Sequence, residues 1–296
     1  MKPGIYALSA AEYHRDPCSA PSLSASIAHE LLSSSAWHAW VAHPMLNPAY
    51  QREDDERFDL GTAAHAYLLE GEAGFAIVQA PDWRTKVAKD ARDHARAEGK
   101  IPLLADRWGD VQAMAVAARK QLQAHEAQPC PLSTGQPEQT LIWQEGETWC
   151  RERLDWLHDD RKTIDDYKTT GASANPEVWT RALFGAGHDV QAAFYLRGLK
   201  TLTGIEAAFR FVVQENFPPF ALSVIGLAPD ALALAERKVA HALACWQHCL
   251  VSGRWPGYPT QTCWATLPPW EEARWMERQP VDDGRPLADQ LFGERA

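Results

Sequence analysis

The sequence predicts an α/β protein with a central mixed β-sheet, flanked by helices and preceded by an N-terminal helical elaboration. Three segments between 138 and 169 are rich in Trp, Ile, Thr and Tyr, and only Gly146 and a polar run at 158–161 separate them. This pattern is typical of an antiparallel meander of three strands. Segments of helical periodicity surround the meander, and two more strand-like segments follow it. The mixture of elements along one chain predicts an α/β fold.

Residues 1–56 carry the helical elaboration. Residues 21–44 predict two short helices, because serines stand at capping positions and a proline ends the second helix. A polar stretch at 51–57 leads into a further helix, which begins near Phe58 and ends at Gly71.

The rest of the chain alternates between helices and strands. Further helices are expected at 84–98, 106–125, 176–185, 188–203 and 229–252. Strands are expected at 75–79, 138–144, 147–157, 162–169, 206–215 and 220–227. Residues 126–137, rich in Pro and Gln, predict a loop, and 253–296 predict an irregular tail. No linker or repeat interrupts the chain, so we expect a single domain over 1–296 with its core at 57–252.

Composition and charge restrict the function. The formal net charge is -10, whereas proteins that simply coat nucleic acid are usually basic. The charge therefore counts against passive DNA coating, but not against an enzyme that gathers its basic residues in one channel. In a closed ring, some of the following basic residues would line such a channel; otherwise they form solvated faces balanced by nearby acids: Arg84, Lys86, Lys89, Arg92, Arg96, Lys100, Arg151, Arg153, Arg161 and Lys162. The N-terminus has no apolar signal region, and no stretch approaches ~18 apolar residues. We expect a cytoplasmic protein without membrane contact.

The residues with chemical potential begin with Asp166 and Lys168. On a strand, residues i and i+2 point to the same face, so these two side chains project together, while Asp165 and Tyr167 point away. Such a pair alone is an ordinary surface ion pair. Asp155, however, ends the preceding strand, and the short turn can bring both aspartates to one edge of the sheet. Mg²⁺ prefers such oxygen ligands.

Three more side chains fit the same site. Gln191 and Tyr195 are separated by one helical turn and share a helix face, where an amide and an aromatic ring suit phosphate contact and base stacking. His65 lies on the helix near Phe58 among small residues that allow close packing on the sheet. Taken singly, each of these residues also fits an ordinary structural role.

In their order along the chain, GTAAHAYLLE, RERLDW, IDDYKTT and DVQAAFY resemble the RecB-like branch of the PD-(D/E)xK nuclease superfamily. The sequence most closely resembles the RecE-type (exonuclease VIII) exonucleases of phages and prophages. The opening YHRDPCSAPSLSASIAHELL and the late CLVSGRWPGYP and LPPW are also similar, so the resemblance covers nearly the whole chain. One departure is Leu154, where the superfamily name has proline.

The resemblance implies a restriction-endonuclease-like core and a role for each matching residue. It makes His65 a support for the metal, Asp155 the metal-bridging aspartate and Asp166 the second carboxylate. The main-chain carbonyl of Tyr167 would be a further metal ligand, and Lys168 the catalytic lysine.

The resemblance also implies the activity and the partners. Gln191 and Tyr195 match the QxxxY motif, which contacts DNA near the cleavage site. The implied enzyme is a Mg²⁺-dependent exodeoxyribonuclease, with Mn²⁺ able to substitute. It would degrade linear duplex DNA processively in the 5′→3′ direction and leave 3′ single-stranded tails. The implied assembly is a ring of three or four copies that works with a single-strand annealing protein of the RecT/Redβ type.

Three other classes of protein remain as alternatives. The first is a nuclease of the CRISPR-adaptation type, whose iron–sulfur cluster would need cysteines such as Cys18, Cys245, Cys249 and Cys263. Their spacings are too wide for a compact cluster, and none of the six cysteines forms a CxxC pair. The second is a catalytically inactive nuclease-fold DNA-binding module. Such a module would be expected to lack one of the three central residues, yet all three are present. The net charge alone favours a third possibility, an acidic adaptor.

Overall fold

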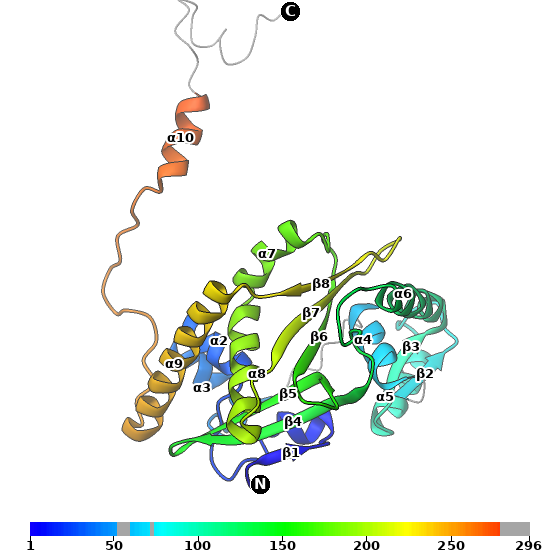
Figure 1. Ribbon diagram of the computed structural model, residues 1–296, viewed down its shortest axis with the longest axis horizontal. Helices are drawn as coiled ribbons and strands as arrows, with labels where there is room; N and C mark the ends of the chain where they lie inside the picture. The colour runs from blue at the N-terminus through cyan, green and yellow to red at the C-terminus, as the bar shows by residue number, and fades with distance from the viewer. Residues whose placement is uncertain (52–59, 72–73, 279–296) are drawn as a thin grey trace, which may run out of the picture. The chain divides into compact units, whose positions relative to one another are not determined.

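A computed structural model describes residues 1–51, 60–71 and 74–278. The chain divides into two compact units, Met1–Gly257 and Tyr258–Ala296. The first unit contains a six-stranded mixed sheet in the order β1-β4-β5-β6-β7-β8, with helices on both faces (Figure 1). The predicted fold class is therefore confirmed.

The predicted meander forms the middle of this sheet. Strands β4 (Gly135–Glu145), β5 (Thr148–His158) and β6 (Thr163–Thr170) pair antiparallel. Two helices intervene before β7 (Ala208–Glu215), which pairs parallel to β6. The two edge strands, β1 (Gly4–Tyr6) and β8 (Leu222–Gly226), pair antiparallel with β4 and β7.

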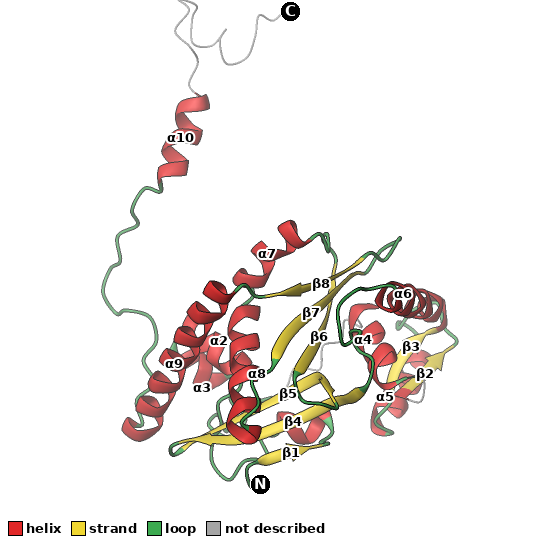
Figure 2. Ribbon diagram, in the orientation of Figure 1, coloured by secondary structure: helices red, strands yellow, loops and turns green. Residues whose placement is uncertain are grey.

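Helices pack on both faces of the sheet (Figure 2). The helices of the first unit are α1 (Ala10–His14), α2 (Ala25–Ser33), α3 (Ala36–Val41), α4 (Leu60–Glu70), α5 (Lys86–Ala97), α6 (Ala105–Gln123), α7 (Pro176–Gly185), α8 (His188–Thr203) and α9 (Pro229–Ser252). A small parallel sheet of β2 (Phe75–Val78) and β3 (Ile101–Leu104) lies beside α4, α5 and α6.

The two faces of the large sheet bury different sets of side chains. Ile164 and Phe211 belong to the main core with residues of α2, α8 and α9. Tyr167 and Val212 pack on the other face, against Leu122 of α6. Because side chains alternate along a strand, consecutive residues of β6 enter different environments.

The sheet opens between β5 and β6. These strands pair only at Trp156↔Asp165 and Leu157↔Ile164. Farther along, β5 pairs instead with the N-terminal segment: Leu23 N–H donates to the Trp149 carbonyl at 2.8 Å. Asp155 lies next to the point where the two strands separate, so its carboxylate is free to bond outside the regular ladder.

A buried polar cluster attaches the N-terminal segment to the sheet. The Asp16 carboxylate accepts hydrogen bonds from the Ser22 backbone at 2.9 Å and its hydroxyl at 2.8 Å. It also pairs with Arg151 at 3.0 Å and His43 at 3.2 Å. Burial would raise the pKa of Asp16, but these partners outweigh it and lower the pKa to about 2. Arg151, expected to line a DNA channel, is only 4% exposed and is instead part of this structural cluster.

Most predicted helices and strands are present, with four differences. β1 and α1 were not predicted, β4 begins inside the expected loop, and the C-terminal tail contains α10 (Pro269–Arg278). α1 is only five residues long, and its signal is the capping box of Ser9 and Glu12. Phe58 lies outside the described residues, as does most of the polar stretch before it. Among the helices that the structure describes, none could span a membrane.

Candidate active site

The candidate residues gather at a cleft of about 530 Å³ in the first unit. Its walls come from the N-terminal helices, α4, the β4–β5 hairpin and the beginning of α8. The lining residues are Tyr13, His14, Ala25, Ser26, His29, Glu30, His65, Glu138, Arg153, Asp155, Ala186, Gly187, His188, Gln191 and Tyr195. The cleft therefore joins segments that are far apart in the sequence.

Asp155 occupies the opening between β5 and β6. Its Oδ2 accepts the backbone N–H of Tyr167 at 2.9 Å and lies 3.0 Å from Nε2 of His65. His65 comes from α4, where Ala63 and Ala64 are fully buried. Their small side chains let α4 approach the sheet closely, as the sequence predicts.

Asp166 and Lys168 project together from β6. Nζ of Lys168 lies 2.5 Å from Oδ2 of Asp166, and Nε2 of Gln191 donates to Oδ1 at 2.8 Å. Asp166 is fully buried, whereas the Lys168 side chain is 25% exposed. Two partners from different elements thus hold both oxygens of Asp166.

The charges of these groups depend on one another. Burial, and then the Asp155 carboxylate, raise the pKa of Asp166 to about 6, against the opposing effect of Lys168. Burial would also raise the pKa of Asp155, but His65 and Lys168 hold it below its ordinary value. Burial disfavours the charged form of Lys168, yet both aspartates raise its pKa above the usual range. Lys168 is therefore a cation at neutral pH.

Glu138 belongs to the same cluster, although the sequence analysis did not identify it. Its carboxylate lies 3.9 Å from Nδ1 of His65, and Arg153 pairs with its other oxygen at 2.8 Å. Burial raises the pKa of Glu138 to about 7, and Asp155 adds to this effect while Arg153 and His65 oppose it. Glu138 also adopts the left-handed backbone conformation, with φ 56°. This conformation is unfavourable for a side-chain-bearing residue and is found mainly at functional sites.

A sequence signal for Glu138 does exist. The hairpin turns at Gly146, and the ladder pairs Pro137 with Trp156 and Gln139 with Leu154. Extending the register from the turn places Glu138 opposite Asp155. An acid opposite an acid in a predicted hairpin would have indicated a second ligand.

These groups can hold a divalent cation. Ligand atoms of His65, Glu138 and Asp155 all lie within 4.8 Å of one another, and the charges of Asp155 and His65 act on the nearby carboxyl group of Asp166. Carboxylate oxygens are the ligands that Mg²⁺ and Mn²⁺ prefer, and an imidazole is accepted by the softer of these metals. The residues therefore fit the metal site that PD-(D/E)xK nucleases generally use.

The remaining predicted residues occupy different positions. Gln191 and Tyr195 both line the cleft, and Tyr195 is 8% exposed. The Tyr167 side chain lies on the opposite face, where its hydroxyl donates to Gln214 at 2.5 Å. The role of the Tyr167 main-chain carbonyl stays a prediction.

Cysteines gather in no metal site. The six cysteines are free. Within the described ranges, the group of His65, Glu138 and Asp155 is the only set of three or more potential ligands that could hold a metal ion. The structure therefore gives no support to the iron–sulfur alternative.

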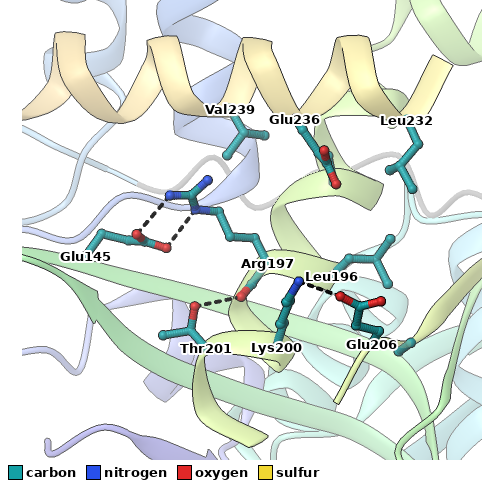
Figure 3. Close-up of a pocket in the computed structure, with 11 residues that line it drawn as sticks. Glu145, Leu196, Arg197, Lys200, Thr201, Glu206, Leu232, Glu236 and Val239 are labelled. Atoms are coloured by element: carbon teal, nitrogen blue, oxygen red, sulfur yellow. Dashed lines mark hydrogen bonds and ion pairs between the residues drawn. The ribbon is translucent and has the colours of Figure 1, made fainter. Parts of the chain in front are cut away.

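A larger hollow of about 650 Å³ lies elsewhere, between α8 and α9 (Figure 3). Its charged side chains mostly pair with one another: Arg197 holds Glu145 with two bonds of 2.7 and 2.9 Å, and Lys200 pairs with Glu206 at 2.7 Å. By size alone, this hollow would be the better candidate for the active site. The chemistry favours the smaller cleft instead, because carboxylates, a histidine and a lysine converge there.

Comparison with known proteins agrees with this geometry. Residues 31–265 match the model of a family described as a PDDEXK-like domain of unknown function (DUF3799). The crystal structure of a candidate exonuclease from Eubacterium rectale superposes with a TM-score of 0.55 at 10% identity, covering 97% of this chain and 99% of that one. At this identity, the likeness shows the fold alone.

Two further comparisons add little. The structure of SSO0001 gives a TM-score of 0.26 at 14% identity, covering 67% of this chain and 96% of that one, and carries no argument. No curated protein matches the sequence. The family match spans well over half of the chain, so the chain belongs to the PDDEXK-like family of domains of unknown function and has the PD-(D/E)xK nuclease fold.

Proposed function

We propose that this protein is a Mg²⁺-dependent exonuclease of the RecE type that degrades linear duplex DNA. The observation that carries the proposal is the convergence of Asp155, Asp166 and Lys168 with His65 and Glu138 beside one cleft. The match to the PDDEXK-like family supports the same chemistry, and the candidate exonuclease from Eubacterium rectale shares the fold.

Each side chain has a task in phosphodiester hydrolysis. His65, Glu138, Asp155 and Asp166 would hold the cation, which when bound would polarise the scissile phosphate and lower the pKa of a bound water. Lys168 stays protonated beside Asp166 and presents a compact positive charge. This charge can offset the negative charge that develops on the phosphate during cleavage. Tyr195 and Gln191 would contact the DNA strand in the cleft.

The shape of the cleft favours a chain end over a continuous duplex. Tyr13 and His14 of α1, together with Ser26 and His29 of α2, line it on the N-terminal side. A strand that enters such a walled cleft most simply does so by its end. By resemblance, the strand would be degraded 5′→3′, leaving a 3′ single-stranded tail for a RecT/Redβ-type annealing protein.

Assembly into a ring of three or four copies completes the proposal. A chain with net charge -10 repels DNA over most of its surface, so basic side chains must be concentrated where DNA passes. Cyclic symmetry would repeat one basic patch around a common axis. Several of the basic residues expected there, including Arg84, Arg92 and Lys100, already pair with nearby acids. The patch would therefore depend on the remaining ones.

The decisive experiment compares end-labelled linear duplex with closed circular DNA, each incubated with Mg²⁺. Wild-type protein should release the 5′ label first and leave the circle intact. Lys168→Ala should remove this activity, while Lys200→Ala, which changes an exposed lysine paired to Glu206, serves as the matched control and should not. Equal digestion of circle and linear DNA, or full activity of Lys168→Ala, would contradict the proposal. Light scattering on the same preparation tests the ring.

A further inference from the structure

The first turn of α8 fixes one imidazole at the edge of the cleft. Gly187 precedes the helix with φ 71°, and His188 is its first residue. The His188 ring stacks on Trp179 of α7, with ring centroids 5.5 Å apart and an angle of 10° between the planes. Phe211 of β7 lies 5.7 Å from the same ring. Aromatic contacts on two sides restrict the rotation of the imidazole.

His188 and Gln191 lie on the same side of this first turn. They are three residues apart, a spacing that brings side chains together on a helix. Both side chains line the cleft, and Gln191 raises the pKa of His188. Nε2 of Gln191 donates to Oδ1 of Asp166 at 2.8 Å. A bond between His188 and Gln191 would therefore link the aromatic stack on Trp179 to the carboxylate of Asp166.

The orientation of the Gln191 amide decides whether its contact with Asp166 is attractive or repulsive. An amide has a donor end and an acceptor end of nearly the same shape. With the nitrogen toward Asp166, the contact is attractive. With the oxygen toward Asp166, two electronegative atoms would face each other in a buried place. A hydrogen-bond donor on the side of the amide away from Asp166 would select the first orientation, because the donor needs the amide carbonyl oxygen as its acceptor.

We propose that His188 is a positioning residue: its ring N–H holds the Gln191 carbonyl, so that the Gln191 amide nitrogen faces Asp166. The inference rests on the proposed function of the cleft, since it concerns the ligand geometry of that site. With Gln191 on Oδ1 and Lys168 on Oδ2, the Asp166 carboxylate is held at both oxygens. Losing His188 would allow the amide to turn and Asp166 to rotate.

The surroundings of His188 keep the ring neutral. Burial, followed by the positive charges of Lys168 and His29, lowers the pKa of His188 to about 4, while Gln191 and Asp189 oppose the shift. A neutral imidazole carries a single N–H. The ring can therefore act as a fixed donor without adding charge to the cleft.

Two substitutions separate packing from hydrogen bonding. His188→Phe keeps an aromatic ring on Trp179 but removes the donor. His188→Asn supplies an N–H donor but removes the stack. If the inference is right, His188→Phe lowers kcat and the affinity for Mn²⁺ about tenfold, as outer partners of metal ligands commonly do, while its Tm stays near that of the wild type. His188→Asn should recover most of both values, although its Tm falls.

A double-mutant cycle adds an independent measurement. In a Gln191→Leu background there is no amide to orient, so adding His188→Phe should change Mn²⁺ affinity by less than twofold. Calorimetry with Mn²⁺ alone measures this without DNA, so a protein that lacks nuclease activity would refute the proposed function and still test His188. Wild-type affinity in His188→Phe would overturn the inference, and so would additive losses in the cycle.

Discussion

Two neighbouring aspartates on β6 have the same burial and opposite surroundings. Asp165 and Asp166 are both fully buried, but their side chains enter different faces of the sheet. Asp165 accepts from His158 at 2.6 Å, from Arg210 at 2.6 and 2.9 Å, and from the Leu132 backbone at 2.9 Å. These contacts join three separate segments, so this face is a structural connection.

Asp166 has fewer and different partners. It contacts Lys168 and Gln191, and the nearby Asp155 carboxylate repels it. Burial opposes ionisation in both residues, yet the partners of Asp165 lower its pKa, whereas the pKa of Asp166 is raised to about 6. The contrast shows that the partners of a buried acid, rather than its burial, separate a structural role from a chemical one.

The largest expected effect comes from removing the negative charge of Asp166. Asp166→Asn should reduce nuclease activity by on the order of 10³-fold or more, because it removes a carboxylate from the proposed metal site. Its stability should equal or exceed that of the wild type, since the repulsion by Asp155 is relieved. Digestion of linear duplex measures the first effect, and urea unfolding measures the second.

Asp165→Asn is the matched variant on the other face. It leaves Arg210 and His158 beside a neutral group, and breaking a buried ion pair in this way costs about 3–5 kcal/mol of the free energy of unfolding. The fraction that remains folded should bind metal normally. Loss of metal binding in Asp165→Asn, or unfolding of Asp166→Asn, would contradict the assignment of a structural role to one face of the sheet and a chemical role to the other.

The sequence was sufficient to separate these two aspartates. Strand alternation predicts that Asp165 and Asp166 point to opposite faces, and the structure confirms it. The meander and the helices that carry His65 and Gln191 followed from periodicity and turn residues in the same way. Such local patterns involve residues that are near each other along the chain.

What could not be predicted depends on contacts between distant segments. The pairing of Leu23 with β5 joins residues more than 120 positions apart, and no local pattern indicates it. Arg151 was expected at a DNA channel because its partner could not be seen from nearby residues. That partner, the buried Asp16, belongs to the same distant N-terminal segment. Glu138 is a different case: the hairpin register gives it a local signal, and only its left-handed backbone could not be predicted.

A smaller effect is the pH dependence of metal binding. The pKa values of Glu138 and Asp166 are raised to about 7 and about 6, and both groups must be ionised to bind a cation. Mn²⁺ affinity should therefore fall at least tenfold between pH 8 and pH 6. Glu138→Gln should bind more weakly at pH 8 and lose the upper part of this dependence. Calorimetry at several pH values tests both expectations.

The stability of the metal-free protein should change in the opposite direction. A carboxyl group whose pKa is raised by folding contributes stability that is present below its unfolded pKa and is lost as pH rises through its folded pKa. For Glu138 and Asp166 this window runs from about 4 to about 7. Asp165, with a lowered pKa, contributes stability above its unfolded pKa that is lost only in acid. A metal affinity that is constant from pH 8 to pH 6 would exclude Glu138 and Asp166 as ligands.

The smallest effect concerns a third buried carboxyl group, Glu152 of β5. It is fully buried beneath α8, and neither oxygen has a hydrogen-bond partner among the described residues. A Cβ added at Gly198 would lie 2.8 Å from its Oε1, so the helix backbone passes close above the carboxyl group. Burial raises the pKa of Glu152 well above the ordinary value. Glu152 is as buried as Asp165 and Asp166, but in the described part of the chain it has neither structural partners like those of Asp165 nor contacts like those of Asp166 with Lys168 and Gln191.

Replacing Glu152 should therefore stabilise the protein. Glu152→Met exchanges an unsatisfied polar group for an apolar one of similar length, and we expect a gain of about 1 kcal/mol in the free energy of unfolding at pH 7. The gain should shrink as pH falls through about 4.3, the ordinary pKa of a glutamate, because the carboxyl group then becomes neutral in the unfolded protein as well. Glu206→Met, at an exposed glutamate paired with Lys200, is the control and should show no gain in stability at pH 7. Urea unfolding at pH 7 and pH 4.5 measures both variants. A less stable Glu152→Met would mean that Glu152 has a bonded partner and would contradict this interpretation of the buried carboxyl group.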